Sequence, residues 1–188
     1  MKKIPLIDVM EGLNILEVLG IFLTLLMAFV FQFVLNELPC PLCLLQRIGF
    51  FSMAFGFLLN LRFGLRPSHY ALVILAALFT SFVALRQIAL HVVPGTGTYG
   101  TPFLGLHLYT WSFIVSMCVI VFTTIFLGVD RQYQPPSTKN MHYPKLTHTL
   151  FVMMAILIIA NIISLIVMCG FHECPENPTS YKLTTPNE

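Results

Sequence analysis

Five long apolar stretches, separated by short polar segments, set the pattern of this sequence. Each has about 20 residues or more, the length that an α-helix needs to cross the hydrocarbon core of a bilayer. The expected helices cover residues 18–36, 42–61, 69–93, 106–129 and 146–169. The pattern therefore predicts an all-α integral membrane protein that forms a single transmembrane domain over residues 1–188.

Composition and charge support a lipid bilayer as the surroundings and exclude one class of partner. Hydrophobic residues make up 57% of the chain and charged residues 10%, whereas a soluble domain carries about 25% charged residues. The net charge of +2 and the absence of a basic run argue against nucleic acid as a partner. Residues 175–188 contain three prolines and few apolar residues, so we expect a flexible tail.

Charge also predicts which ends of the helices face the cytoplasm. Five spans put the termini on opposite sides, and a cytoplasmic N-terminus leaves seven basic residues inside against three outside. The inner set is Lys2, Lys3, Arg62, Arg66, Arg131, Lys139 and Lys145, and the outer set is Arg47, Arg86 and Lys182. This bias follows the positive-inside rule. It places Cys40, Cys43 and the C-terminus outside, and the space outside a bacterial inner membrane, the periplasm, is oxidising.

Two cysteines at the start of the second helix form the most informative motif. Cys40 and Cys43 are separated by two residues, and Pro41 suits the first helical position, which makes Cys40 the expected N-cap. The helix N-terminus stabilises a thiolate, the form of cysteine that attacks disulfides. Arg47 follows Cys43 by four residues and so shares its helix face. An arginine within a membrane is costly, so we interpret these residues as a thiol–disulfide redox site.

Other interpretations of the motif stay open. The cysteines can be small apolar fillers of a non-catalytic scaffold, and Arg47 can extend to the interface. Alternatively the protein binds a metal, with Cys40, Cys43, His172 and Cys174 as four zinc ligands. Elemental analysis and alkylation of the cysteines would separate these alternatives. Cys118 lies in the middle of an apolar run, and we expect it to fill the core.

Three segments resemble the DsbB family of bacterial thiol–quinone oxidoreductases. The first is the motif Pro-Cys-x-x-Cys-x-x-x-Arg after the first span, at residues 39–47. Residues 86–94 are similar to the end of that family's third helix, and residues 104–111 to the start of its fourth. The resemblance covers about 18–129 and implies a four-helix bundle, to which this chain adds a fifth transmembrane helix.

The resemblance also implies an activity and roles for particular residues. A periplasmic thioredoxin-fold, DsbA-like dithiol protein would be the partner, and its electrons would pass to ubiquinone or menaquinone. Cys40 and Cys43 would form the catalytic pair, with Cys40 the more exposed sulfur and Cys43 facing the quinone. Arg47 would bind the quinone, and Gln87 and His91 fall where that family lines its quinone pocket.

One departure from the family pattern concerns the second outer loop. Well-studied members carry a second cysteine pair there, whereas residues 91–107 of this chain contain no cysteine. Either the partner attacks the Cys40–Cys43 disulfide directly, or Cys169 and Cys174, brought outside by the fifth helix, replace the missing pair. Cys169 and Cys174 can equally form a static disulfide or remain unpaired thiols.

Overall fold

The computed structural model describes residues 6–92, 95, 97–133, 143–170, 174, 181 and 183. Its helices are α1 (Leu6–Val34), α2 (Pro41–Phe63), α3 (Pro67–Val92), α4 (Leu108–Leu127), the 3-10 turn η1 (Asp130–Gln132) and α5 (Pro144–Cys169). The five α-helices are long and apolar enough to cross a membrane, and no β-strand occurs among the described residues. The prediction of an all-α membrane protein with five spanning helices is therefore confirmed.

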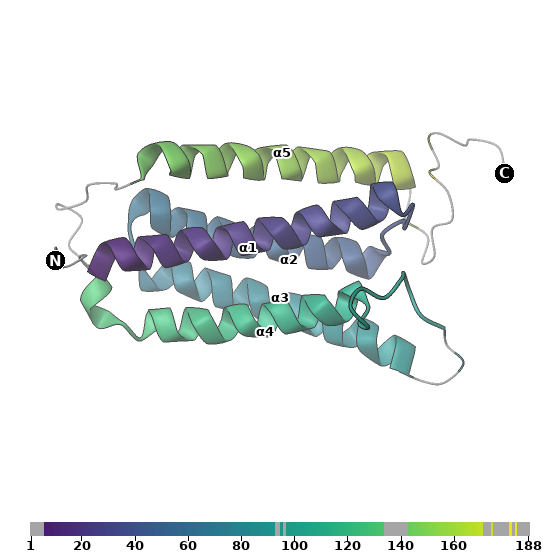
Figure 1. Ribbon diagram of the computed structural model, residues 1–188, viewed down its shortest axis with the longest axis horizontal. Helices are drawn as coiled ribbons and strands as arrows, with labels where there is room; N and C mark the ends of the chain where they lie inside the picture. Colours follow the sequence, from purple (N-terminus) through teal and green to yellow (C-terminus); the bar gives the residue numbers. More distant parts are fainter. Residues whose placement is uncertain are drawn as a thin grey trace.

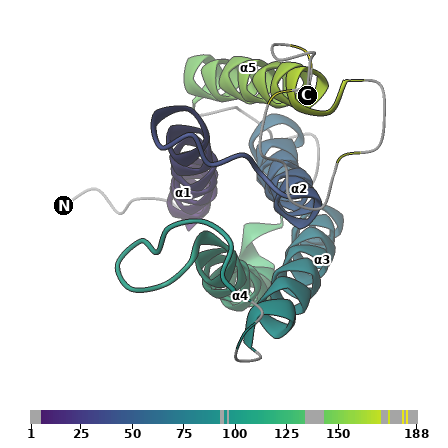
Figure 2. The same cartoon turned by 90° about the vertical axis from the view of Figure 1, so that its right-hand side faces the viewer.

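The helices run side by side along the long axis of the molecule (Figure 1). Viewed from one end, α1 to α4 form a ring and α5 lies outside it, next to α1 and α2 (Figure 2). Contacts agree with this view, because α5 packs mainly on α2. The fold is therefore a four-helix bundle with an added fifth helix. One end of the bundle, the cysteine end, holds the α1–α2 connector, the α3–α4 loop and the last turn of α5.

Local sequence explains where the helices begin and end. Proline occupies the first position of α2 and α5, where the absence of a backbone N–H costs nothing. Gly64 follows α2 with a φ of 92°, a left-handed conformation that favours glycine. Helix α1 starts at Leu6, well before the expected residue 18. Hydropathy missed this first part because polar side chains such as Glu11 interrupt the apolar run, although they do not interrupt the helix.

A buried polar network joins the helices at the end opposite the cysteines. Asn14 donates to the Tyr70 hydroxyl at 2.9 Å, and Asn60 donates to Asn14 at 3.0 Å. The Tyr70 hydroxyl in turn donates to Gln132 at 3.1 Å. All four side chains are at most 1% exposed. Since an unpaired polar group within a bilayer costs several kcal/mol, this network fixes α1, α2, α3 and η1 to one another.

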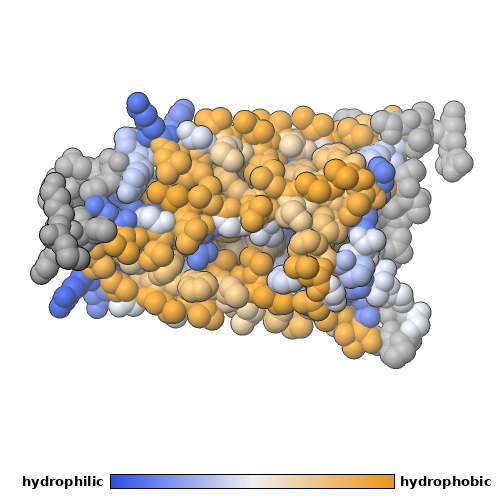
Figure 3. Space-filling model, viewed as in Figure 1, coloured by the Kyte–Doolittle hydropathy of each residue, from blue (hydrophilic) through white to orange (hydrophobic). Residues whose placement is uncertain are grey.

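Many large apolar side chains are exposed along the helices, as expected for contact with lipid. The face drawn in Figure 3 is mostly apolar between its two ends. Cys118 is exposed on α4 as well, so the prediction that it fills the core is wrong. Helix α4 buries few of its residues, and a small apolar thiol suits its outer face equally well. The tail 175–188 lies outside the described residues except at two positions. Of these, Leu183 donates its backbone N–H to the carbonyl of Val167 at 3.2 Å.

Candidate redox site

The cysteine motif lies at the junction between the α1–α2 connector and α2. Cys40 is the N-cap of α2, as predicted, and its sulfur accepts a hydrogen bond from the Cys43 backbone N–H at 3.2 Å. Both residues are free cysteines in this structure. The cap places the Cys43 sulfur in the first turn of the helix, where unpaired backbone N–H groups and the helix dipole stabilise negative charge.

The exposures of the two cysteine residues reverse the expected order. Cys40 is only 5% exposed, whereas Cys43 is half-buried and lines a cavity. By residue exposure, the order is therefore opposite to the one expected for the two sulfurs. Cys40 is buried because the connector and α3 pack around the N-cap, which sequence spacing does not reveal. A hydrogen bond with Cys43, together with burial, raises the pKa of the Cys40 thiol.

Gln87 of α3 contacts both cysteine sulfurs. Its amide nitrogen lies 3.3 Å from the Cys40 sulfur and 3.5 Å from the Cys43 sulfur. Its carbonyl oxygen accepts a hydrogen bond of 2.7 Å from Gln46, which fixes the orientation of the amide. Sequence comparison suggested Gln87 for a quinone pocket, and the side chain both lines the cavity and donates toward the sulfurs. Gln46 was not selected from the sequence, although a glutamine within an apolar helix next to Arg47 was an available signal.

Arg47 is 5% exposed, so it does not extend to the interface. Its guanidinium donates to Gln32 at 2.8 Å, to the Ala28 carbonyl at 3.0 Å and to Asn161 at 3.4 Å. The guanidinium carbon also lies 4.9 Å from the centre of the Phe29 ring, within the range of a cation–π interaction. Neutral groups from α1 and α5 therefore bind this buried cation. Gln32 and Asn161 were missed by the sequence analysis.

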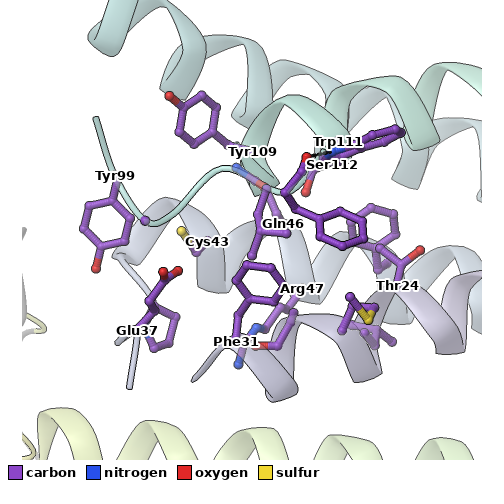
Figure 4. Close-up of a pocket in the computed structure, with 18 of the residues that line it drawn as sticks. Thr24, Phe31, Glu37, Cys43, Gln46, Arg47, Tyr99, Tyr109, Trp111 and Ser112 are labelled. Carbon is purple, nitrogen blue, oxygen red and sulfur yellow. Dashed lines mark hydrogen bonds between the residues drawn. The ribbon is translucent and has the colours of Figure 1, made fainter. Parts of the chain in front are cut away.

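A cavity of about 240 Å³ lies beside these side chains, with walls from α1, α2 and α4. Figure 4 shows Cys43, Gln46 and Arg47 along the α2 wall, with Trp111 and Ser112 on the α4 side. Most of the remaining wall is apolar, for instance Phe31 of α1. An apolar cavity with a few polar groups at one place is the usual form of a small-molecule site.

The α3–α4 loop covers the cavity at the cysteine end, and we name residues 97–107 the roof segment. The Tyr99 hydroxyl donates to the Leu38 carbonyl, and burial raises the pKa of this hydroxyl. The Glu37 carboxylate accepts hydrogen bonds from the Thr101 backbone N–H at 2.8 Å and from its hydroxyl at 2.5 Å. These bonds tie the roof segment to the connector that carries Cys40.

His91, the other residue suggested for the quinone pocket, lies behind the cavity wall. Its ring stacks on Tyr109 with the ring centres 5.6 Å apart, and Tyr109 lines the cavity while His91 does not. The His91 Nδ1 atom lies 3.2 Å from the carbonyl oxygen of Gly97. His91 therefore contacts the roof segment and Tyr109 and does not line the cavity itself.

Cys169 and Cys174 form a disulfide at the end of α5. Cys169 packs in a cluster with Leu38, Leu44 and Met168, beside the connector that carries Cys40. The pair is thus bonded, which leaves the shuttle and the static disulfide as its possible roles. The alternative metal site loses Cys174 to this bond, while His172 lies outside the described residues. Across the described ranges no group of three His, Cys, Asp or Glu side chains is arranged to hold a metal.

Comparison with known proteins agrees with the motif. Residues 11–99 match the family described as DsbB, disulfide bond formation protein DsbB. No curated protein and no solved structure matches the chain significantly. The matched segment contains Cys40, Cys43, Arg47 and Gln87, whereas the similarity noted at residues 104–111 lies beyond it, as does all of α5. Through residues 11–99, the chain belongs to the DsbB family of disulfide bond formation proteins.

Proposed function

We propose that this protein oxidises the dithiol of a periplasmic, thioredoxin-fold DsbA-like protein and passes the two electrons to ubiquinone or menaquinone in the membrane. One observation carries the proposal. Cys43 and Arg47 lie one turn apart on the same face of α2, and both residues line one apolar cavity within the bundle. A reactive sulfur and a buried cation beside a lipid-like cavity suit an apolar acceptor that carries polar carbonyl groups.

The cavity residues fit a quinone headgroup by their chemistry. A bound quinone supplies two carbonyl oxygens, which accept hydrogen bonds, and takes up two electrons and two protons to leave as quinol. Gln46 and Arg47 offer N–H donors from the α2 wall, and Phe31 and Trp111 offer flat apolar surfaces. Helices α1 and α4 make few direct contacts with each other, so an apolar tail can extend between them toward the lipid.

The thiol chemistry begins at a Cys40–Cys43 disulfide. A thiolate of the partner attacks the Cys40 sulfur, the S–S bond to Cys43 breaks, and Cys43 leaves as a thiolate. Arg47 and the N-terminus of α2 stabilise that negative charge, and the Gln87 amide donates a hydrogen bond to it. The second partner thiolate then attacks the mixed disulfide and releases Cys40. The partner leaves oxidised, and the two electrons stay on the Cys40 and Cys43 sulfurs.

Transfer to the acceptor restores the disulfide. Cys43, which lines the cavity, gives up the electron pair, and Cys40 closes on it to reform the S–S bond. Cys40 is suited to reforming the S–S bond because the raised pKa of its thiol keeps it protonated until Cys43 has reacted. Since Cys40 is buried, the partner's attack requires the roof segment or the connector to move first.

The orientation belongs to the same proposal. From the order of the five spans in the sequence, seven basic residues are expected on the side of the N-terminus and three on the side of the cysteines. By the positive-inside rule the N-terminus is cytoplasmic, and Cys40, Cys43 and the C-terminus face the periplasm of a bacterial inner membrane. That compartment contains thioredoxin-fold oxidants whose dithiols require reoxidation.

An anaerobic turnover assay tests the proposal. The purified protein is mixed with a reduced thioredoxin-fold substrate and a short-chain quinone, and quinol and substrate disulfide are measured together. We expect one quinol for each disulfide formed. If the protein did not raise the rate of quinone reduction above the rate measured without it, the proposed function would be contradicted.

For the Cys169–Cys174 disulfide we propose a structural role. Cys169 is 2% exposed and packs against Leu38 of the connector and Leu44 of α2. Replacing both cysteines with serine is expected to leave quinone reduction within about twofold of wild type. The bond closes a short loop, so its loss should lower the free energy of unfolding by about 2 kcal/mol.

The choice of electron donor separates this role from a shuttle. The double serine variant is assayed with the thioredoxin-fold substrate and, separately, with dithiothreitol, a small dithiol that can reach Cys40 and Cys43 directly. Equal retention with both donors supports the structural role. Activity lost with the protein substrate but kept with dithiothreitol would show that Cys169 and Cys174 relay electrons.

A further inference from the structure

We propose that α5 is part of the electron-acceptor site, and that Asn161 positions Arg47 while leaving its positive charge available to the acceptor. This inference rests on the proposed function, because it takes Arg47 as the group that faces the acceptor. It assigns a role to a helix that lies wholly outside the segment matched to the DsbB family.

Hydrogen bonds of Arg47 and Gln32 connect α1, α2 and α5. Arg47 donates to Gln32 at 2.8 Å and to Asn161 at 3.4 Å. The amide nitrogen of Gln32 lies 2.5 Å from the Ser164 hydroxyl, so α5 also fixes the residue that accepts from Arg47. Asn161 and Ser164 are three residues apart and share one helix face. Both are less than 9% exposed, in the part of α5 after Thr149, where every exposed residue is apolar.

The neutrality of these partners matters for a cation in low dielectric. Every described contact of Arg47 is with an uncharged group: two amide oxygens, a backbone carbonyl and the Phe29 ring. A carboxylate at the position of Asn161 would hold the guanidinium as firmly and cancel its charge. An amide holds the guanidinium and leaves the charge, which can then act on a carbonyl oxygen or on the Cys43 thiolate.

The outer end of α5 is held in register with this contact. Leu165, Met168 and Cys169 pack with Leu38 and Leu44 of the connector and α2. The disulfide closes the chain just beyond this cluster. Asn161 lies about one turn before Leu165 and two turns before Met168. Packing of the cluster and the hydrogen bonds to Arg47 and Gln32 therefore fix the position of this part of α5 along the bundle.

Three variants test the inference in the full-length protein, with a short-chain quinone as the probe. Asn161→Ala removes the contact and is expected to raise KM for the quinone about tenfold. Asn161→Asp restores an acceptor but neutralises Arg47, and we expect a loss in kcat/KM at least as large. Ile162→Ala, at a neighbouring exposed position of α5, is the matched control and should stay within twofold of wild type.

A second readout excludes a general loss of structure. Exchange between the Cys40–Cys43 disulfide and dithiothreitol, measured without quinone, should change less than threefold in Asn161→Ala. An unchanged KM for Asn161→Ala, or wild-type kcat/KM for Asn161→Asp, would overturn the inference. The Asp variant keeps the test valid if Asn161→Ala does not fold. If the wild-type protein did not reduce the quinone, the proposed function itself would be contradicted instead.

Discussion

Replacing Cys43 with serine is expected to reduce quinone reduction to the background rate of the uncatalysed reaction. Cys43 is the sulfur that lines the cavity, and a hydroxyl can neither form the disulfide nor give up an electron pair. The loss should appear in kcat and not in KM for the quinone, because the cavity and Arg47 remain in place. The measurement is steady-state quinol formation with the thioredoxin-fold substrate in excess.

Cys118→Ser is the matched control for this variant. Cys118 is exposed on α4, away from the cavity lining, so its replacement should leave turnover unchanged. Incubated with the oxidised form of the partner, Cys43→Ser should attack the partner's disulfide through Cys40, release one partner thiol and accumulate a mixed disulfide, visible by non-reducing gel electrophoresis. Full activity of Cys43→Ser would contradict the mechanism. A mixed disulfide trapped only in Cys40→Ser would move the entry point to Cys43, the residue that is more exposed in this structure.

Arg47→Met is expected to lower kcat/KM for the quinone by about 100-fold. Methionine keeps much of the length and apolar volume of the side chain but removes the charge and the donors. Loss of one preorganised donor to a developing negative charge costs about 100- to 1,000-fold in catalysis, and we take the lower value because Gln46 and Gln87 remain. The measurement is quinone-dependent turnover at saturating dithiol, with the Cys40–Cys43 thiol exchange rate measured separately.

Arg47→Lys supplies the comparison for this prediction. Lysine keeps the charge but cannot bind Gln32, Asn161 and the Ala28 carbonyl in the planar geometry of a guanidinium. We expect activity between those of wild type and Arg47→Met. If Arg47→Met reduced thiol exchange and quinone reduction equally, Arg47 would act on the Cys43 thiolate alone. Unchanged kcat/KM for the quinone in Arg47→Met would remove Arg47 from the acceptor site.

The part of this structure that follows from the sequence is the part set by short-range rules. Apolar length predicts five spanning helices, and Pro41 predicts that α2 begins just after Cys40. The spacing of Cys43 and Arg47 predicts that they share a face. Each of these depends only on residues within a few turns of one another, so one chain is enough to derive them.

The remainder depends on how distant segments pack. The burial of Cys40 results from the connector and from Gln87 of α3, which are set by tertiary packing. Asn161 was missed because nothing in an apolar helix tells which face meets Arg47, more than one hundred residues earlier in the chain. A buried arginine within a membrane helix implies neutral or acidic partners, and an asparagine in the most apolar span is in hindsight the best available signal.

The Cys40–Cys43 pair and its acceptor can be tested most directly by following all five cysteines through a single oxidation. The protein is reduced mildly, so that Cys169–Cys174 stays bonded, then mixed anaerobically with one equivalent of short-chain quinone and quenched with an alkylating reagent for mass spectrometry. The expected result is that Cys40 and Cys43 convert to a disulfide, with one quinol per protein and no change at Cys118. Cys40 and Cys43 remaining as alkylated thiols while the quinone stays oxidised would contradict it.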